Sequence, residues 1–321
     1  MINAYAITGP TASGKTALGI AVAKELGCEI VSCDSMQIYR YMDIGTAKPT
    51  PEERAEVPHC LIDFLDPGTP YSAMDYVSDA LAAAKGISER GKTPLFVGGT
   101  GLYIDSLIRA ESEDVPKSDP AFKEKYQALT LTKEGREELY RMLLAVDPQS
   151  ALSTHRNNVR RVLRALEIYE TTGIPKSVFD EATKKPRDGI RVKMVTLDFS
   201  NRDLLYSRID RRVDEMMDCG LLAEVERLYD LGYLSQKSTA AQAIGYKELL
   251  GAIRGETTVG EAVEQLKQSS RRYAKRQLTW FRKEPDAVRL TVDTPDGMMR
   301  PFSDLVSECI NIFANNSLQG E

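Results

Sequence analysis

The chain has few of the residues that build metal centres or disulfide frameworks. Two of its 321 residues are histidine and five are cysteine, and no two cysteines form a C-x-x-C pair. A zinc site is therefore not expected. An odd number of cysteines without regular spacing is typical of reduced thiols, so we expect a cytoplasmic protein.

Long apolar runs, a basic leader and an excess of positive charge are missing as well. No apolar stretch approaches membrane-spanning length, and the first residues enter a strand-like run without the basic segment of a signal peptide. The formal net charge is −5, so bulk charge does not indicate a nucleic-acid partner, and such a site must come from local clusters. We expect no membrane partner, a monomer, and about two domains for this length.

The most informative motif that is present lies at residues 9–16. GPTASGKT matches the phosphate-binding P-loop pattern G-x-x-x-x-G-K-[ST], between a strand-like run and a predicted helix over residues 17–26. In such a loop, backbone N–H groups and the helix N-terminus bind phosphate oxygens. The motif predicts a di- or triphosphate ligand, and a glycine-rich turn without ligand is the alternative. The expected binding residues are Gly9, Thr11, Ala12, Ser13, Gly14, Lys15, which would contact the terminal phosphate, and Thr16, which would offer its hydroxyl to Mg²⁺.

Strand and helix signals alternate over the first third of the chain. This alternation is typical of a parallel sheet covered by helices. It stops near residue 111 and resumes near residue 191. We therefore predict an α/β fold with a P-loop parallel-sheet core flanked by helices, residues 1–112 and 191–321, and an inserted all-helical domain, residues 113–190. Strands are predicted at residues 4–7, 29–33, 60–65, 93–97, 191–197 and 288–292; helices at 73–89, 134–146, 157–171, 202–218, 221–231, 240–254, 259–283 and 302–313.

Polar residues follow two of the predicted strands, and we expect both sets near the P-loop. Asp34 follows the run 29–33, and the turn Gly-Gly-Thr-Gly follows the run 93–97. Ligands of open α/β sheets bind at the carboxyl ends of the strands. Asp34 is either a general base or metal-associated carboxylate, or else a cap for a turn or helix. Thr100 can cap a turn, contact the ligand, or do both.

Basic residues cluster on two predicted helices of this acidic protein. Residues 271–283 contain six basic residues and no acidic one, on two adjoining faces beside an apolar stripe that includes Val259, Leu266 and Tyr273. For the cluster at residues 271–283, the alternative to a binding site is a solvated helix surface. For a second cluster, in the predicted insertion, the alternative is pairing with neighbouring glutamates. We favour binding of nucleic-acid phosphates. The second cluster lies in the predicted insertion and comprises His155, Arg156, Arg160, Arg161 and Arg164.

A further arginine cluster follows the strand at residues 191–197. Arg208, Arg211 and Arg212 lie on a predicted helix that has an apolar face of its own. An arginine here can form paired hydrogen bonds with a pyrophosphate. A surface helix stabilised by salt bridges is an equally good interpretation of the spacing.

Taken together, these motifs resemble the tRNA dimethylallyltransferase family, also called tRNA isopentenyltransferases or IPP transferases. The P-loop occurs in many NTP-binding enzymes, but its combination with the other blocks in this order is specific. The resemblance runs nearly end to end. The matching blocks are GPTASGKT (9–16), DSMQIYR (34–40), DIGTAKP (43–49), GGTGLY (98–103), HRN…RRVLRALE (155–167), AIGYKE (243–248) and KRQLTWFR (275–282).

The resemblance implies an activity, substrates and a cofactor. Family members transfer the dimethylallyl group of dimethylallyl diphosphate to N6 of adenosine 37 in tRNA, which gives N6-(dimethylallyl)adenosine and diphosphate, and they need Mg²⁺. Their P-loop holds the prenyl diphosphate rather than ATP. The inserted helical domain helps to hold the anticodon stem-loop, while the base is extruded into a channel.

The resemblance also implies roles for individual residues. Asp34 matches the carboxylate that accepts a proton from adenine N6, and Thr100 matches a threonine at the tRNA end of the channel. Arg208 is our choice for the arginine that grips the diphosphate, with Arg211 and Arg212 as alternatives. tRNA contacts are implied for Asp34, Ser35, Met36, Gln37, Thr100, Arg160, Arg161, Arg164, Gln242, Gly245, Lys247, Lys275, Arg276, Gln277, Trp280 and Arg282.

Two other functions are compatible with a P-loop. A nucleotide or small-molecule kinase explains the loop and the sheet, but it does not explain two basic clusters or a large helical insertion. A non-catalytic RNA-binding protein with a structural P-loop does not explain Asp34 beside a diphosphate pocket. Binding of dimethylallyl diphosphate rather than ATP separates these hypotheses.

Overall fold

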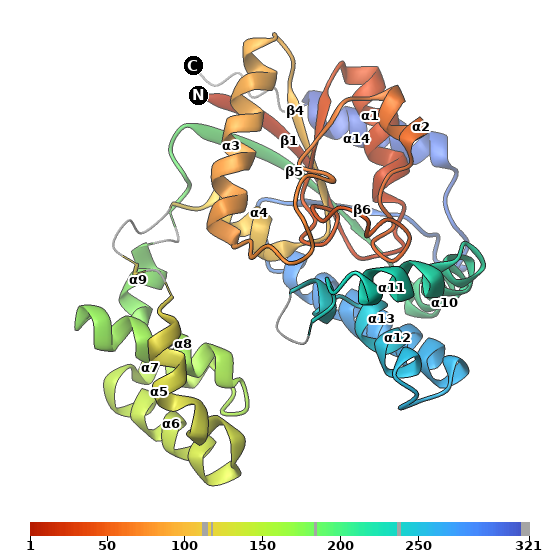
Figure 1. Ribbon diagram of the computed structural model, residues 1–321. Coiled ribbons are helices and arrows are strands. Elements are labelled where there is room, and N and C mark those ends of the chain that lie inside the picture. The colour runs from red at the N-terminus through yellow and green to blue at the C-terminus, as the bar shows by residue number, and fades with distance from the viewer. Residues whose placement is uncertain (111–114, 117, 183–184, 236–238, 316–321) are drawn as a thin grey trace. The chain divides into compact units, whose positions relative to one another are not determined.

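The chain forms two compact units. The computed structural model describes residues 1–110, 115–116, 118–182, 185–235 and 239–315 (Figure 1). Met1–Ile108 and Gly189–Glu321 form the first unit, and Arg109–Asp188 form the second. Within the described ranges, no helix combines the length and the hydrophobicity that crossing a membrane requires.

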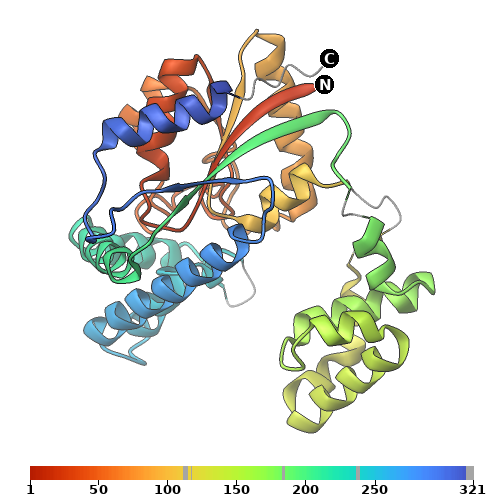
Figure 2. The same ribbon diagram turned by 180° about the vertical axis from the view of Figure 1, so that it is seen from behind.

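A six-stranded sheet is the centre of the first unit, and every strand pairing described is parallel (Figures 1 and 2). All residues of the inner strands β2 and β4 are buried, as expected for a parallel sheet covered on both faces. The predicted α/β fold is confirmed. The strand order is β3-β2-β4-β1-β5-β6, with β1 at Ile2–Thr8, β2 at Glu29–Ser32, β3 at His59–Cys60, β4 at Pro94–Gly98, β5 at Ile190–Asp198 and β6 at Val288–Thr291.

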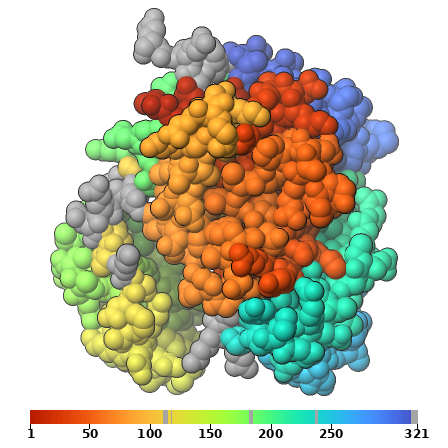
Figure 3. Space-filling view, turned by 45° about the horizontal axis from the view of Figure 1, so that its top comes forward, coloured from red at the N-terminus to blue at the C-terminus, as the bar shows by residue number. Residues whose placement is uncertain are grey.

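Helices cover both faces of the sheet because successive strand residues point in opposite directions. Leu95 and Val97 of β4 pack in one apolar cluster with α1 and α14, whereas Phe96 packs in another cluster with α3 and α4. The N-terminal third of the chain, red to orange, forms much of one face of this unit (Figure 3). These helices span Lys15–Leu26 (α1), Phe302–Asn315 (α14), Ala73–Glu89 (α3), as predicted, and Gly101–Ile108 (α4).

A further group of helices in this unit shares an apolar cluster with the chain that follows β2. Tyr39 and Met42 are fully buried against Val225 and Leu249 of this group. The cluster fixes the segment after β2 against helices more than 150 residues away in the sequence. The group comprises α10 (Arg202–Asp218), α11 (Leu221–Asp230), the short 3₁₀ helix η1 (Ala240–Gln242), α12 (Tyr246–Ile253) and α13 (Val259–Phe281); α2 (Pro51–Glu56) lies between β2 and β3 in the chain.

The predicted strand over residues 60–65 is wrong beyond Cys60. Leu61 and Asp63 have φ angles of 59° and 61°, in the left-handed region that an extended strand does not use. The chain therefore leaves the sheet after two paired residues, and β3 is a short edge strand.

The predicted helix over residues 240–254 is wrong in its middle. Ala243 is extended, with ψ of 141°, and Gly245 has φ of 99°, so the chain makes a turn between η1 and α12. The left-handed φ at Gly245 suits a residue without a side chain. This turn matters because Gln242, Ala243, Ile244 and Gly245 line the cavity described below.

The second unit is helical and has its own apolar core. Leu139 and Leu143 of α6 pack against Val162 and Leu166 of α8. Pro120 and Pro148 stand at the first positions of α5 and α7, where a missing N–H costs nothing. The helices are α5 (Pro120–Leu131), α6 (Lys133–Val146), α7 (Pro148–Ser153), α8 (Val159–Thr172) and α9 (Lys176–Ala182). The unit spans Arg109–Asp188, against 113–190 expected from the sequence.

Candidate active site

A cavity of about 680 Å³ opens in the first unit at the carboxyl ends of β1, β2 and β4. Because these strands are parallel, their ends bring together the P-loop after β1, Asp34 after β2 and the glycine-rich turn after β4. Helices α10 and α13, the turn between η1 and α12 and the segment that follows Asp34 contribute much of the remaining wall. The volume suits a small-molecule ligand.

The P-loop has the backbone geometry that phosphate binding requires. Ala12 and Gly14 have φ angles of 61° and 89°, and Gly14 leads directly into α1. The Ser13 hydroxyl is buried and finds no hydrogen-bond partner among the described residues. An unpaired buried hydroxyl in such a loop fits a phosphate oxygen as its missing partner.

Lys15 lies in this loop with its ammonium turned onto the backbone. Its Nζ donates to the Pro10 carbonyl oxygen at 2.6 Å. Burial and then the neighbouring Arg212 guanidinium lower the pKa of Lys15 to about 7, although the Asp34 carboxylate favours the charged form. Near neutral pH the Lys15 amine of the free loop is therefore only partly protonated, and a bound anion would favour its ammonium form.

The three arginines of α10 have different surroundings. Arg212 lines the cavity, and burial lowers its pKa although Asp34 opposes that shift. Arg208 is not part of the lining: its Nε donates to the Ala12 carbonyl oxygen at 2.9 Å, which braces the P-loop. Arg211 is exposed and lies 3.7 Å from Glu215. Of the three, Arg212 is the one that faces the ligand space.

Asp34 both fixes a turn and faces the cavity. Its Oδ1 accepts hydrogen bonds from the backbone N–H groups of Met36, at 2.9 Å, and Gln37, at 3.4 Å. The carboxylate also belongs to the cavity wall. The two alternatives that the sequence left open for this residue are therefore compatible: one oxygen acts as a cap, and the residue lines the ligand space.

Thr100 joins the ends of β4 and β2. Its Oγ1 accepts a hydrogen bond from the Ser35 N–H at 3.0 Å and lies 3.4 Å from the Ser35 hydroxyl. The same side chain is a hydrogen-bond partner of Tyr273, which reaches it from α13. Thr100 thus holds the backbone beside Asp34 and lies behind the cavity wall.

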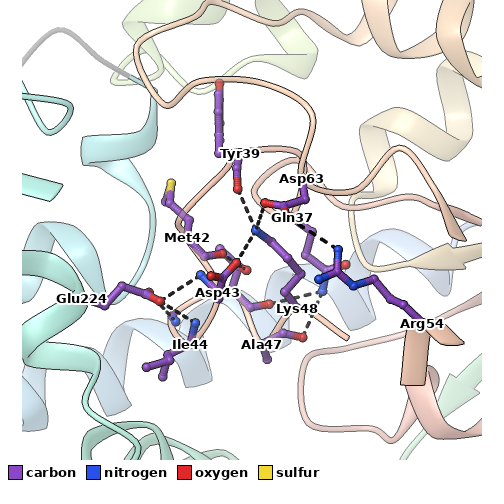
Figure 4. Close-up of polar contacts among 12 residues, drawn as sticks. Gln37, Tyr39, Met42, Asp43, Ile44, Ala47, Lys48, Arg54, Asp63 and Glu224 are labelled. Carbon is purple, nitrogen blue, oxygen red and sulfur yellow. Dashed lines mark hydrogen bonds and ion pairs between the residues drawn. The ribbon is translucent and has the colours of Figure 1, made fainter. Parts of the chain in front are cut away.

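A buried lysine fixes the loop that continues from Asp34. Figure 4 shows the Lys48 ammonium directed at Asp43, Asp63 and the carbonyl oxygen of Tyr39, at 2.5, 2.8 and 2.9 Å. Arg54 lies 3.6 Å from the other oxygen of Asp63. The Lys48 side chain is 2 % exposed, so two carboxylates and a carbonyl replace its hydration.

A buried glutamate fixes the same loop from the helical side. Glu224 of α11 accepts hydrogen bonds from the N–H groups of Asp43, Ile44 and Gly45 at 2.8–3.1 Å (Figure 4). It also accepts one from the Tyr246 hydroxyl at 2.6 Å. Sequence reasoning singled out this block of residues as a motif but assigned no role to its members, and the glutamate that binds its backbone is about 180 residues away.

Helix α13 supplies the last part of the wall. Tyr273, Arg276 and Gln277 line the cavity, and the Arg276 guanidinium lies 5.5 Å from the centre of the Tyr273 ring. The sequence placed Tyr273 on a core-facing stripe with Val259; the structure puts the tyrosine at the cavity and leaves Val259 42 % exposed. Trp280 packs beside Gly101, where a Cβ would lie 2.5 Å from its ring.

The basic clusters separate into paired and unpaired side chains. Arg271 and Arg282 of α13 pair with Asp210 and Asp198, at 2.5 and 2.8 Å. In the second unit Arg156 and Arg164 pair with glutamates in the same way. In the part of the chain that the structure describes, no ion pair is found for Arg160, Arg161, Arg272, Lys275 and Arg276.

Most of the residues with implied tRNA contacts come together. Thr100, Lys275, Trp280 and Arg282 lie in the first unit but are not part of the lining, and the three arginines of α8 lie in the second unit. The cavity lining includes Asp34, Ser35, Met36, Gln37, Gln242, Gly245, Lys247, Arg276 and Gln277.

Known proteins resemble the chain over nearly its whole length. It matches the family described as IPP transferase over residues 37–284, and the family described as isopentenyl transferase over residues 2–63. A tRNA dimethylallyltransferase of Shouchella clausii is 49% identical over 298 residues, which are 92% of this chain and 94% of that protein. A tRNA dimethylallyltransferase of Bacillus subtilis is 47% identical over 91% of both chains.

Solved structures agree with these matches. The full-length tRNA isopentenylpyrophosphate transferase of Bacillus halodurans has 40% sequence identity and a TM-score of 0.72, with 98% of this chain and 96% of that chain covered. A eukaryotic dimethylallyltransferase acting on tRNA has 30% identity and a TM-score of 0.74, with 91% and 74% covered. The chain belongs to the IPP transferase family, the family of the tRNA dimethylallyltransferases.

Proposed function

We propose that this protein transfers the dimethylallyl group of dimethylallyl diphosphate to N6 of adenosine 37 in tRNA. The products are N6-(dimethylallyl)adenosine and diphosphate. The observation that carries the proposal is one cavity that is lined both by the P-loop with Lys15 and by Asp34. A diphosphate site next to a general base suits alkyl transfer to a weakly nucleophilic amine.

The P-loop side would hold the leaving group. As the bond between the prenyl carbon and the diphosphate oxygen breaks, its electron pair goes to the diphosphate, where negative charge grows. Lys15, Arg212 and Ser13, which line the cavity, would stabilise that charge. Charged and polar groups held in position before the reaction stabilise such a transition state strongly.

Mg²⁺ fits this side as an ion that arrives with the substrate. Among the described residues, no group of three histidine, cysteine, aspartate or glutamate side chains could hold a metal by itself. Mg²⁺ typically keeps several waters and binds substrate phosphates with few protein groups. Here the Thr16 hydroxyl would be the protein ligand, and the bound ion would offset charge on the diphosphate.

The Asp34 side would activate the nucleophile. The lone pair of adenine N6 is delocalised into the ring, so the amine attacks poorly unless a proton leaves as the carbon–nitrogen bond forms. Asp34 keeps Oδ1 on the backbone of Met36 and Gln37, which orients the carboxylate. We assign the acceptance of the N6 proton to this carboxylate.

tRNA would be held by the unpaired basic side chains. Arg272, Lys275 and Arg276 on α13 and, in the second unit, Arg160 and Arg161 on α8 are free to bind backbone phosphates, which supply most of the affinity of such complexes. Extrusion of the base costs a few kcal/mol, less in a loop than in a duplex. We place the protein in the cytoplasm, in line with its five free cysteines, and propose that it is a monomer.

The experiment that tests the proposal uses dimethylallyl diphosphate labelled in the prenyl group, Mg²⁺ and the full chain. The acceptors are two tRNA transcripts that differ at position 37, adenosine or guanosine. We expect label only on the adenosine transcript, and no need for ATP. A requirement for ATP, hydrolysis of ATP at millimolar concentration, or label on both transcripts would contradict the proposal and favour a kinase or another acceptor.

A further inference from the structure

One amide side chain connects the two sides of the cavity. Gln277 of α13 is 5 % exposed. Its Oε1 accepts a hydrogen bond from the backbone N–H of Thr11 in the P-loop at 2.9 Å. Its Nε2 donates to the backbone carbonyl oxygen of Gly99, after β4, at 2.8 Å. A single buried side chain therefore satisfies a donor on one loop and an acceptor on the other.

The loops are shaped to admit this side chain. A Cβ on Gly99 would lie 2.3 Å from Gln277 Nε2, so a glycine at this position is what allows the contact. On the P-loop, Ala12 follows Thr11 and has a left-handed φ of 61°. Such a backbone costs a non-glycine residue on the order of 1–3 kcal/mol and persists only where its surroundings hold it. The Arg208 side chain donates a hydrogen bond to the carbonyl oxygen of Ala12, and the Gln277 side chain accepts one from the N–H of the adjacent Thr11.

The connection continues to the carboxylate. Gly99 precedes Thr100, whose Oγ1 accepts the N–H of Ser35, the neighbour of Asp34. The Thr100 N–H itself donates to the carbonyl oxygen of Cys33 at 3.1 Å. A continuous series of hydrogen bonds and peptide units thus runs from the diphosphate loop through Gln277 to both neighbours of the proposed base.

We infer that Gln277 is a positioning residue that sets the P-loop at a fixed distance from Asp34. It acts through the backbones of Thr11 and Gly99, and its amide is already engaged at both ends by the protein. The inference rests on the proposed function for the identity of the two reacting groups. It assigns Gln277 to the binding of the prenyl diphosphate, in place of the tRNA contact expected from the sequence.

The test compares Gln277→Met and Gln277→Asn with Gln268→Met, an exposed glutamine of the same helix. Methionine fills nearly the same volume without the two hydrogen bonds, and asparagine keeps the amide but is one methylene too short to bridge both loops. Methionine leaves both backbone groups without their partner and asparagine leaves at least one, so we expect kcat/KM for dimethylallyl diphosphate to fall about 10- to 100-fold in both variants. Affinity for tRNA should change less than about twofold, with an unchanged salt dependence.

A second measurement separates positioning from general stability. Binding of inorganic pyrophosphate with Mg²⁺, without tRNA and well below the melting temperature of each variant, should weaken about tenfold or more in both Gln277 variants and remain normal in Gln268→Met. Unchanged pyrophosphate binding with weaker tRNA binding and a flatter salt dependence would make Gln277 a tRNA contact and overturn the inference. If wild type binds pyrophosphate but transfers no prenyl group, the proposed function fails, while the pyrophosphate comparison still decides the role of Gln277.

Discussion

The two sides of the cavity differ in charge and in what they do with it. The P-loop side presents Lys15 and Arg212, two cations whose pKa values are lowered by burial. The other side presents Asp34, with one oxygen fixed on the backbone. Prenyl transfer needs both, because negative charge leaves on the diphosphate while a proton leaves the attacking amine. A single cavity can therefore stabilise the negative charge on the leaving diphosphate and also accept a proton from the attacking amine.

Removal of the Lys15 ammonium group should have the largest effect on prenyl transfer. Lys15→Ala takes away the charge nearest the expected terminal phosphate, so we expect prenyl transfer to fall below detection. The Asp34 side and the basic surface stay intact, so tRNA affinity should remain near that of wild type. Label transfer and filter binding of tRNA measure the two quantities, and Lys85→Ala, on the exposed surface of α3, is the control. Loss of tRNA binding in Lys15→Ala would mean that the two sides do not act separately.

The lowered pKa of Lys15 gives a smaller effect that depends on pH. In the free protein burial holds this pKa at about 7, and a bound diphosphate favours the ammonium form. Pyrophosphate binding at pH 8 should therefore take up close to one proton, and the affinity should fall as the pH rises above 7. Calorimetry in two buffers with different heats of ionisation measures the uptake. Lys15→Arg, which stays protonated, should take up none; equal uptake by both proteins would assign the proton to another group.

Substitution of single basic residues on the surface of α13 should have the smallest effects. Lys275→Ala or Arg276→Ala should each reduce the slope of log affinity for tRNA against log salt by about one unit. Arg271→Ala and Arg282→Ala should leave the slope nearly unchanged, because these arginines already pair with aspartates. A salt titration of all four variants checks this. Equal flattening by paired and unpaired residues would show that the ion pairs do not limit tRNA contact.

The parts of the site that the sequence predicted are those determined locally. The P-loop pattern includes the strand before it and the helix after it, and both are found as β1 and α1. Asp34 and Thr100 could be placed because the carboxyl ends of parallel strands meet at one edge. The predicted helix over residues 73–89 is confirmed to the residue, since Ser72 and Asp75 form a capping box at its start.

The parts that the sequence could not show depend on distant pairs. Glu224 holds a loop about 180 residues away, and Gln277 reaches the P-loop across 266 residues of sequence. Nothing in the local pattern of either helix distinguishes these side chains from ordinary polar residues. Tyr273 fitted an apolar stripe, and the stripe gave no sign that the helix passes a cavity there. Likewise, spacing alone did not distinguish the paired arginines from the free ones.

The central claim is that Asp34 accepts the proton from adenine N6 in a cavity where the P-loop holds the diphosphate. Its most direct test is the single-turnover rate of Asp34→Asn with tRNA and dimethylallyl diphosphate both saturating. Asparagine retains an oxygen for the Met36 and Gln37 N–H groups, so the turn should stay in place while the base is lost. We predict a rate about 10²–10⁴-fold below that of wild type, the usual contribution of a general base, with affinities for tRNA and pyrophosphate nearly unchanged. A rate near that of wild type would contradict the account.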